Sequence, residues 1–190
     1  TLDENKAIYA RDTAFVTIDQ ALLDADIFLG LSGPGTIKKE WIAEMADRPL
    51  VLALANPIPE IMPEEIKSVR PDAVIATGRS DYPNQVNNVL CFPFIFRGAL
   101  DVGATKITEE MKLACVYAIA ELAQAERSDV VASAYEGQEL SFGPEYIIPT
   151  PFDPRLITLI APAVAQAAMN SGVATLPIQD MADYREKISN

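Results

Sequence analysis

The chain has 190 residues, of which 49% are hydrophobic, so it can bury roughly 70% of the surface of its unfolded state in one large or two small domains. Its 27 acidic and 15 basic residues give a formal net charge of −12, which repels nucleic-acid phosphates and anionic lipid. Histidine is absent, which excludes a Ser-His-Asp triad and any histidine-based zinc site. We therefore expect a globular chain with neither nucleic acid nor membrane as a partner.

The two cysteines, Cys91 and Cys115, both lie in apolar runs. They are too few for a cysteine-only zinc site, and reduced cysteines in a core are typical of an intracellular protein, a disulfide between them being the alternative. No signal peptide opens the chain, and no apolar run has the length of a membrane span. We therefore expect a cytoplasmic protein. Because the sequence begins at Thr1 without an initiator Met, we also expect a longer protein.

Strand and helix patterns alternate over the first half of the chain. Residues 24–32 begin with two aspartates and continue as a short apolar run that is stopped by Ser32-Gly-Pro-Gly35, which predicts a buried strand followed by a tight turn. A helix over residues 36–46 follows, with Thr36 as its cap. Residues 48–55 form a continuous apolar run, which predicts a strand covered on both faces.

A third strand completes this pattern. Residues 63–69 predict a short helix, with Pro63 near its first turn, and residues 73–77 predict the next strand. Three strands joined by crossover helices predict a parallel, doubly wound sheet, whose ligand crevice lies beyond the carboxyl ends of the strands. Those ends are Ser32-Gly33, Asn56-Pro57 and Thr77-Gly78.

The second half of the chain predicts helices. Residues 86–101 predict a buried helix that kinks, or starts a second time, near Pro93. Further helices are expected over 108–124 with Thr108 as cap, from Pro154 to Gly172, and over 180–188, with a loop over 136–154.

Amide side chains mark the predicted crevice. Asn56 opens the turn Asn56-Pro-Ile-Pro-Glu60. Asn84 lies in the loop after the third predicted strand, and Asn87 and Asn88 stand directly before the apolar run 89–96. A helix start presents unpaired N–H groups to an anion, and amides add directed donors without adding charge, so this composition suits a carboxylate ligand. The local alternative is that Asn56 merely ends a strand and the asparagine pair caps a helix.

The turn at Ser32 and Gly33 also has two interpretations. Such a turn most often only joins a strand to a helix. In a dinucleotide-binding fold, Gly33 and Gly35 would let the backbone approach the cofactor. The Gly-x-Gly-x-x-Gly loop is missing, so in a Rossmann-type domain we expect the first strand and its glycine turn before Thr1.

Several segments resemble malic enzymes, in particular the bacterial form that is often fused to a phosphotransacetylase-like domain. The resemblance covers nearly the whole chain, and the family also has paired asparagines before an apolar helix. The segments that carry it are Leu54-Ala-Asn-Pro-Ile-Pro-Glu60, Ser80-Asp-Tyr-Pro-Asn-Gln-Val-Asn-Asn88, Phe96-Arg-Gly-Ala-Leu-Asp-Val-Gly103 and Phe152-Asp-Pro-Arg155.

This resemblance implies oxidative decarboxylation of (S)-malate to pyruvate and CO₂ with reduction of NAD(P)⁺, and the fused form favours NADP over NAD. It implies that Asn56 and Asn88 bind the substrate. It also implies that Ser32, Gly33, Asn56 and Asn87 contact the cofactor. The general base, the proton donor and the carboxylates that hold Mg²⁺ or Mn²⁺ are expected upstream, so no catalytic residue and no metal ligand is assigned here.

The expected fold is α/β, with a partial Rossmann-like, doubly wound parallel sheet followed by a helical layer of the catalytic domain. Residues 1–85 would form the C-terminal part of the NAD(P)-binding domain, and residues 86–190 would belong to the substrate and metal domain. We expect a homo-oligomer, and we expect the isolated chain to be inactive. The alternatives are another two-domain NAD(P)-dependent dehydrogenase, such as an amino-acid dehydrogenase, and a non-catalytic dinucleotide-binding or oligomerisation module.

Overall fold

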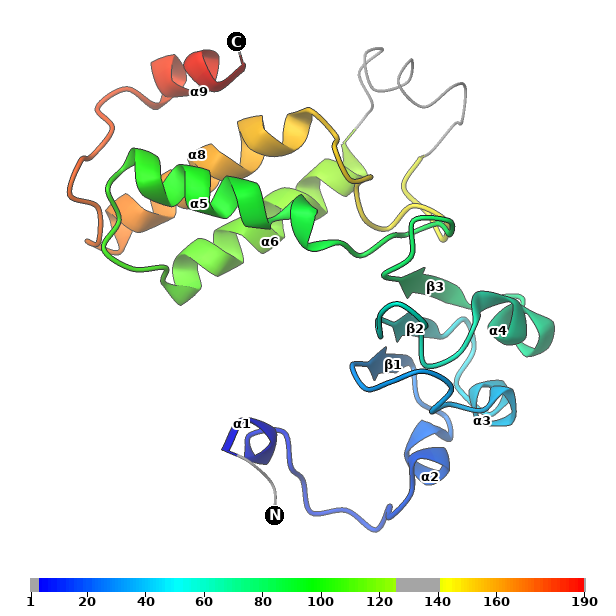
Figure 1. The fold of residues 1–190 in the computed structure, drawn as a ribbon. Coiled ribbons are helices and arrows are strands. Elements are labelled where there is room, and N and C mark those ends of the chain that lie inside the picture. Colours follow the sequence, from blue (N-terminus) through cyan, green and yellow to red (C-terminus); the bar gives the residue numbers. More distant parts are fainter. Residues whose placement is uncertain (1–3, 126–140, 190) are drawn as a thin grey trace.

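The computed structural model describes residues 4–125 and 141–189. A small sheet with its own helices forms one part, and a group of long helices lies beside it (Figure 1). In chain order the elements are α1 (Glu4–Ala7), α2 (Ile18–Leu22), β1 (Ile27–Gly30), α3 (Lys39–Ala43), β2 (Leu50–Ala53), α4 (Pro63–Val69), β3 (Val74–Thr77), the 3₁₀-helix η1 (Asn88–Leu90), α5 (Phe92–Asp101), α6 (Glu109–Gln124), α8 (Arg155–Asn170) and α9 (Met181–Ser189).

The sheet is parallel, with the strand order β1-β2-β3. Ile27 pairs with Leu50, and Leu50 pairs with Val74. Successive right-handed crossovers that advance in one direction place their helices on the same side of a sheet, and α3 and α4 do lie on one side of the strands (Figure 1). The predicted parallel, Rossmann-like sheet is confirmed.

The two faces of the sheet differ in burial. Phe28, Val51 and Ile75 point to the face that packs against α3 and α4. Ile27 and Leu29 alternate with Phe28, so they point to the opposite face, and they are 59% and 56% exposed. The prediction of a buried first strand is therefore wrong, because β1 lies at the edge of the sheet and its outer face meets no helix within the described residues.

Helix α3 is shorter than the predicted helix over residues 36–46. Its N-cap is Lys38, and the hydroxyl of Thr36 instead donates to the carbonyl of Gly33 at 3.0 Å. The N–H of Ile37 donates to the carbonyl of Glu60 at 3.2 Å. This long-range bond fixes the turn after β1 and delays the start of the helix.

The other predicted elements agree with the structure to within one or two residues. Helix α4 has the predicted bounds, and the apolar segment before residue 101 starts a second time at Phe92, as η1 gives way to α5. The Thr108 hydroxyl accepts from the N–H of Met111 and caps α6 as expected. Of the predicted loop 136–154, residues 136–140 lie outside the described residues, and the rest contains no helix or strand.

Helices α5, α6 and α8 pack around a second core (Figure 1). Gly98 of α5 lies directly against α8, since a Cβ at this position would lie 2.3 Å from the carbonyl oxygen of Ala161. The absence of a side chain therefore sets how closely the two helices approach. No helix in the described parts of the chain combines the length and the apolar character needed to cross a bilayer.

Both cysteines are free, as expected, and they meet inside this helical layer. The Sγ atoms of Cys91, before α5, and Cys115, on α6, lie 3.0 Å apart. The Cys115 thiol donates to Cys91, which lowers the pKa of Cys91 to about 7. The same contact and burial raise the pKa of Cys115. Cys91 is thus the more reactive thiol of the pair.

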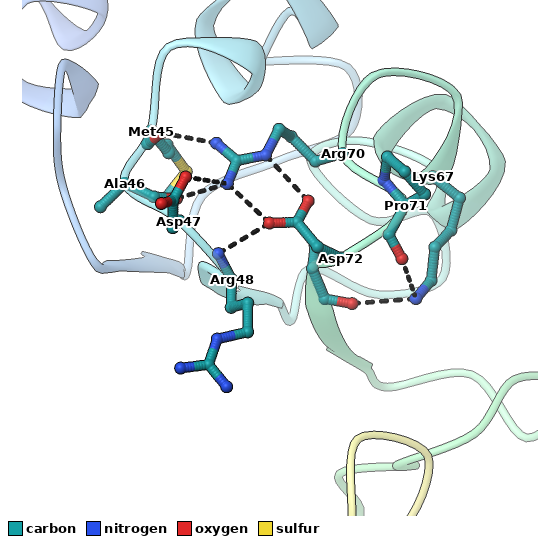
Figure 2. Close-up of polar contacts among 9 residues, drawn as sticks. Met45, Ala46, Asp47, Arg48, Lys67, Arg70, Pro71 and Asp72 are labelled. Atoms are coloured by element: carbon teal, nitrogen blue, oxygen red, sulfur yellow. Dashed lines mark hydrogen bonds and ion pairs between the residues drawn. The ribbon is translucent and has the colours of Figure 1, made fainter.

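Arg70, the C-cap of α4, ties residues 45–48 to residues 70–72 (Figure 2). Its guanidinium donates to the carbonyls of Met45 and Ala46 at 2.5 and 2.6 Å. It also binds the carboxylate of Asp72, which accepts from the backbone N–H of Arg48 at 2.7 Å. The Arg70 side chain is 11% exposed. Arg70 and the N–H of Arg48 hold the pKa of Asp72 well below its usual range.

We expect Arg70→Ala to lower the free energy of unfolding by about 1–3 kcal/mol, because the carbonyls of Met45 and Ala46 lose their donors. Urea denaturation measures this change. Arg48→Ala is the matched control, since the guanidinium of Arg48 points away from these contacts in Figure 2. A group whose pKa is depressed in the folded state stabilises the fold above its unfolded pKa, so the difference between wild type and Arg70→Ala should shrink as the pH falls below about 4. Equal stability of the two alanine variants would contradict this role of Arg70.

We expect iodoacetamide to label Cys91 before Cys115, with a pH midpoint near 7 for the labelling rate. The substitution Cys115→Ala removes the donated hydrogen bond, so the midpoint should rise toward the ordinary thiol value of about 8.5. Peptide mass spectrometry after timed labelling measures both rates. A midpoint that does not move in Cys115→Ala would show that the neighbouring thiol does not set the pKa of Cys91.

Candidate functional site

The carboxyl ends of the three strands meet at one edge of the sheet, and polar residues gather there. Ser32 follows β1, Asn56 follows β2 and Gly78 follows β3. The amide of Asn56 lies flat against Gly78, because a Cβ at Gly78 would be 2.5 Å from its Oδ1 and 2.7 Å from its Nδ2. The structure thus brings the predicted residue Asn56 onto the neighbouring strand end, where its side chain remains exposed to solvent.

A buried carboxylate connects the first two strand ends. Glu60 is 0% exposed, and its Oε1 accepts from the backbone N–H of Ser32 at 2.8 Å. Its Oε2 accepts from the backbone N–H of Ala55 at 3.1 Å. Glu60 lies in the segment 54–60 that resembles malic enzymes, but no role was predicted for it. The signal in the sequence was a single acidic residue between Pro59 and Ile61, after the apolar residues 57–59.

The turn after β1 leaves space above it. A Cβ at Gly33 would meet no atom within 4 Å, and Ser32 is exposed. The Ser32 hydroxyl lies 3.1 Å from that of Thr36. The backbone at Gly33 is therefore open to a ligand that approaches the sheet edge.

The asparagine pair follows β3. Gln85 pairs with Thr77 in a parallel bridge, so the chain after it continues past the carboxyl end of the sheet. Asn87 caps η1, with its Oδ1 accepting from the N–H of Val89 at 3.0 Å. Asn88 is the exposed first residue of η1. The expected capping role is therefore correct for Asn87, whose oxygen caps η1, but not for Asn88, which is not the cap of η1 or α5.

Asn84, three residues earlier, was expected to add an amide donor for the ligand, but its role is structural. It is buried with a φ of 55°, a conformation that asparagine tolerates. Its Nδ2 donates to the carbonyls of Ile75 at 2.9 Å and Pro144 at 2.7 Å. Its Oδ1 accepts from the N–H of Ile147 at 2.8 Å. The whole amide is used in joining β3 to the segment before α8, which leaves it no part in binding a ligand.

A cleft of about 520 Å³ opens beside this segment, between residues 80–85 and residues 145–152. At its rim Arg79 pairs with Asp81 at 2.6 Å, and the hydroxyl of Tyr82 donates to Glu64. That bond to Glu64 raises the pKa of Tyr82. Ser32, Asn56 and the asparagine pair do not line this cleft. The sheet edge and the cleft are therefore separate features of the surface.

Within residues 4–125 and 141–189, no three histidine, cysteine, aspartate or glutamate side chains lie close enough to hold a metal ion together. The described residues therefore do not fit a divalent metal site by themselves, and the chemistry of the strand ends is that of neutral hydrogen-bond donors.

The family model described as "Malic enzyme, NAD binding domain" matches residues 4–135. Among related proteins, the NADP-dependent malic enzyme of Salmonella typhimurium is 68% identical over 98% of this chain, which covers 25% of that protein. The NAD-dependent malic enzyme of Rhizobium meliloti is 60% identical over 99% of this chain and 24% of that protein. This chain thus spans about a quarter of the length of these relatives.

Solved structures give the same result. The malic enzyme of Pyrococcus horikoshii is 43% identical, with a TM-score of 0.73, over 90% of this chain and 36% of that one. The malic enzyme of Entamoeba histolytica is 39% identical, with a TM-score of 0.75, over 92% of this chain and 34% of that one. Because the NAD-binding domain model matches more than half of its residues, this chain belongs to the malic enzyme family.

Proposed function

We propose that the full-length protein catalyses the oxidative decarboxylation of (S)-malate to pyruvate and CO₂, with reduction of NADP⁺ or NAD⁺. The observation that carries this proposal is the 68% identity to an NADP-dependent malic enzyme along 98% of the chain. The amide-lined edge of the sheet supports it, since neutral donors suit a dicarboxylate.

Two features of the sheet edge suit a nicotinamide cofactor. Gly33 leaves the turn after β1 open, and Gly78 leaves room for the amide of Asn56 at the next strand ends. In this proposal Ser32, Gly33, Asn56 and Asn87 contact the cofactor. Crevices of this kind bind dinucleotides at the carboxyl ends of parallel strands. When bound, NAD(P)⁺ supplies the acceptor for the hydride from malate.

Asn56 and Asn88 then orient the substrate. Both side chains are exposed. An amide N–H donates to a carboxylate and, being neutral, adds no charge of its own to the site. Their part is to hold malate, whereas the residues that move protons and hold the metal are proposed to lie elsewhere in the protein.

We place the domain boundary near residue 85. Two separate hydrophobic cores support this position, one built from Leu22 to Ile75 and one from Leu90 to Ala168. In this arrangement residues 1–85 belong to the NAD(P)-binding domain and residues 86–190 to the substrate and metal domain, and a cleft between the domains closes over malate.

We also propose a cofactor preference, a further domain, an oligomeric state and a cellular location. NADP is favoured over NAD, although relatives of both names are similar to this chain. This chain covers 25% of the Salmonella typhimurium enzyme but 42% of the NADP-dependent malic enzyme of Halomonas elongata, so the Salmonella enzyme is much longer. A phosphotransacetylase-like domain would account for the extra length, and we propose that this protein has one too. We also propose a homo-oligomer, and a cytoplasmic location that accords with the two free cysteines.

The reaction is tested by malate-dependent reduction of NADP⁺ and of NAD⁺ by the full-length protein, with Mn²⁺ present and CO₂ trapped. Pyruvate and CO₂ formed in step with the reduced cofactor support the proposal and give the cofactor preference. A folded, metal-loaded protein that binds dinucleotide without oxidising malate would favour another two-domain dehydrogenase. A protein that binds no dinucleotide would favour an oligomerisation module.

We expect Asn88→Ala in the full-length protein to lower kcat/KM for malate about tenfold to a hundredfold. The reason is the loss of an amide hydrogen bond to a carboxylate, worth about 1.5–3 kcal/mol. Steady-state kinetics at saturating cofactor measure the change. Asn170→Ala, at the far end of α8, serves as the control for loss of an exposed asparagine amide. An unchanged kcat/KM in Asn88→Ala would remove this residue from the site.

A further inference from the structure

Glu60 lies beneath the sheet edge and is held there by donors from two strand ends. Besides the backbone N–H groups of Ser32 and Ala55, the hydroxyl of Ser32 donates to its Oε1 at 3.4 Å. The carboxyl group rests against Gly30, where a Cβ would lie 2.6 Å from its Cδ. Gly30 thus provides the space that the carboxylate occupies.

The backbone of the same segment holds the rest of the turn after β1. The carbonyl of Pro59 accepts from the N–H of Gly35 at 3.4 Å, and the carbonyl of Glu60 accepts from the N–H of Ile37 at 3.2 Å. The loop after β2 therefore fixes residues 32–37 through both side chain and backbone.

Packing does not explain an acidic side chain here. A carboxylate that is 0% exposed loses its hydration, which is unfavourable unless hydrogen bonds or a cation compensate for it. The contacts described above are N–H and O–H donors, and within the described residues no lysine or arginine forms an ion pair with Glu60. An apolar residue would avoid the desolvation but could not accept from Ser32 and Ala55.

We propose that Glu60 is a positioning residue for the cofactor crevice, whose buried carboxylate fixes the Ser32 turn and the Ala55-Asn56 turn in the relative position that dinucleotide binding requires. This inference rests on the proposed function. Glu60 does not contact the ligand. It acts through Ser32, which follows β1, and Asn56, which follows β2, the residues proposed to contact the cofactor.

Two substitutions disturb this carboxylate in different ways. Glu60→Gln keeps the shape, but its single oxygen can accept from one strand end only, and its NH₂ group then faces an N–H donor at the other. Gly30→Ala keeps the charge, but its methyl group occupies the space of the carboxyl group. If the position of the carboxylate is what matters, both changes should have the same effect.

The test measures the Kd of NADPH, and of NADH as a second probe, by fluorescence titration of the full-length protein, with steady-state kinetics alongside. Glu60→Gln and Gly30→Ala should each raise the Kd and the KM for the cofactor about tenfold, while kcat at saturating cofactor changes less than threefold. The double variant should lose less affinity than the two single losses combined, because both act on one contact. Glu40→Gln, which removes an exposed carboxylate on α3, is the matched control and should behave as wild type.

A folded Glu60→Gln variant that binds NADPH within twofold of wild type would overturn the proposal, whatever its thermal stability. If Glu60→Gln does not fold, Gly30→Ala carries the same comparison. Failure of both to fold would also overturn it, since Glu60 would then serve stability alone. A wild-type protein that binds NADPH but does not oxidise malate contradicts the proposed reaction and leaves the affinity comparison intact.

Discussion

Three parallel strands in sequential order place the loop of the middle strand between the other two strand ends, and the candidate site depends on this arrangement. Asn56, at the start of that loop, lies across the end of β3, while Glu60, four residues later, reaches the end of β1. Both contacts need a glycine on the neighbouring strand end: Gly78 makes room for the amide and Gly30 for the carboxylate. The loop after β2 therefore organises both sides of the edge from one central position.

The sheet depends on polar contacts between segments that are distant in sequence. Its strands have four residues each, so the hydrogen bonds between strands are few and hold only a small sheet together. Glu60 binds the turn after β1, and Arg70 binds the two carbonyls after α3. Because these groups are largely removed from water, their hydrogen bonds define one arrangement and penalise others that leave a buried group unpaired.

Local pattern was sufficient to predict most elements but not their environment. Pro63 near the first turn of α4, the cap at Thr108 of α6, and Pro154 and Gly172 around α8 predicted these helices closely, since these signals lie within the helices or directly beside them. The exposure of Ile27 depends on which elements cover the edge strand, and the late start of α3 depends on a bond between Ile37 and Glu60. Neither property can be read from residues 24–46 alone.

The site was predictable to the same extent. Strand-end logic correctly placed Asn56 at the carboxyl end of β2, whereas the separate roles of Asn84, Asn87 and Asn88 were not apparent from a cluster of like residues. Nor did spacing reveal Glu60, because its partners come from two different strands. Residue type indicates what a side chain can do, and its long-range neighbours decide whether it remains available to a ligand.

Asn84 links the sheet to the helical layer. Its buried amide binds Ile75 in β3 on one side and Pro144 and Ile147 on the other, so it connects the sheet to the chain that enters α8. On the other side of that connection, α8 is locked to α5 by the close contact at Gly98. A rotation between the two parts that preserves these contacts must keep Asn84 nearly stationary, so this residue is the pivot of any such rotation.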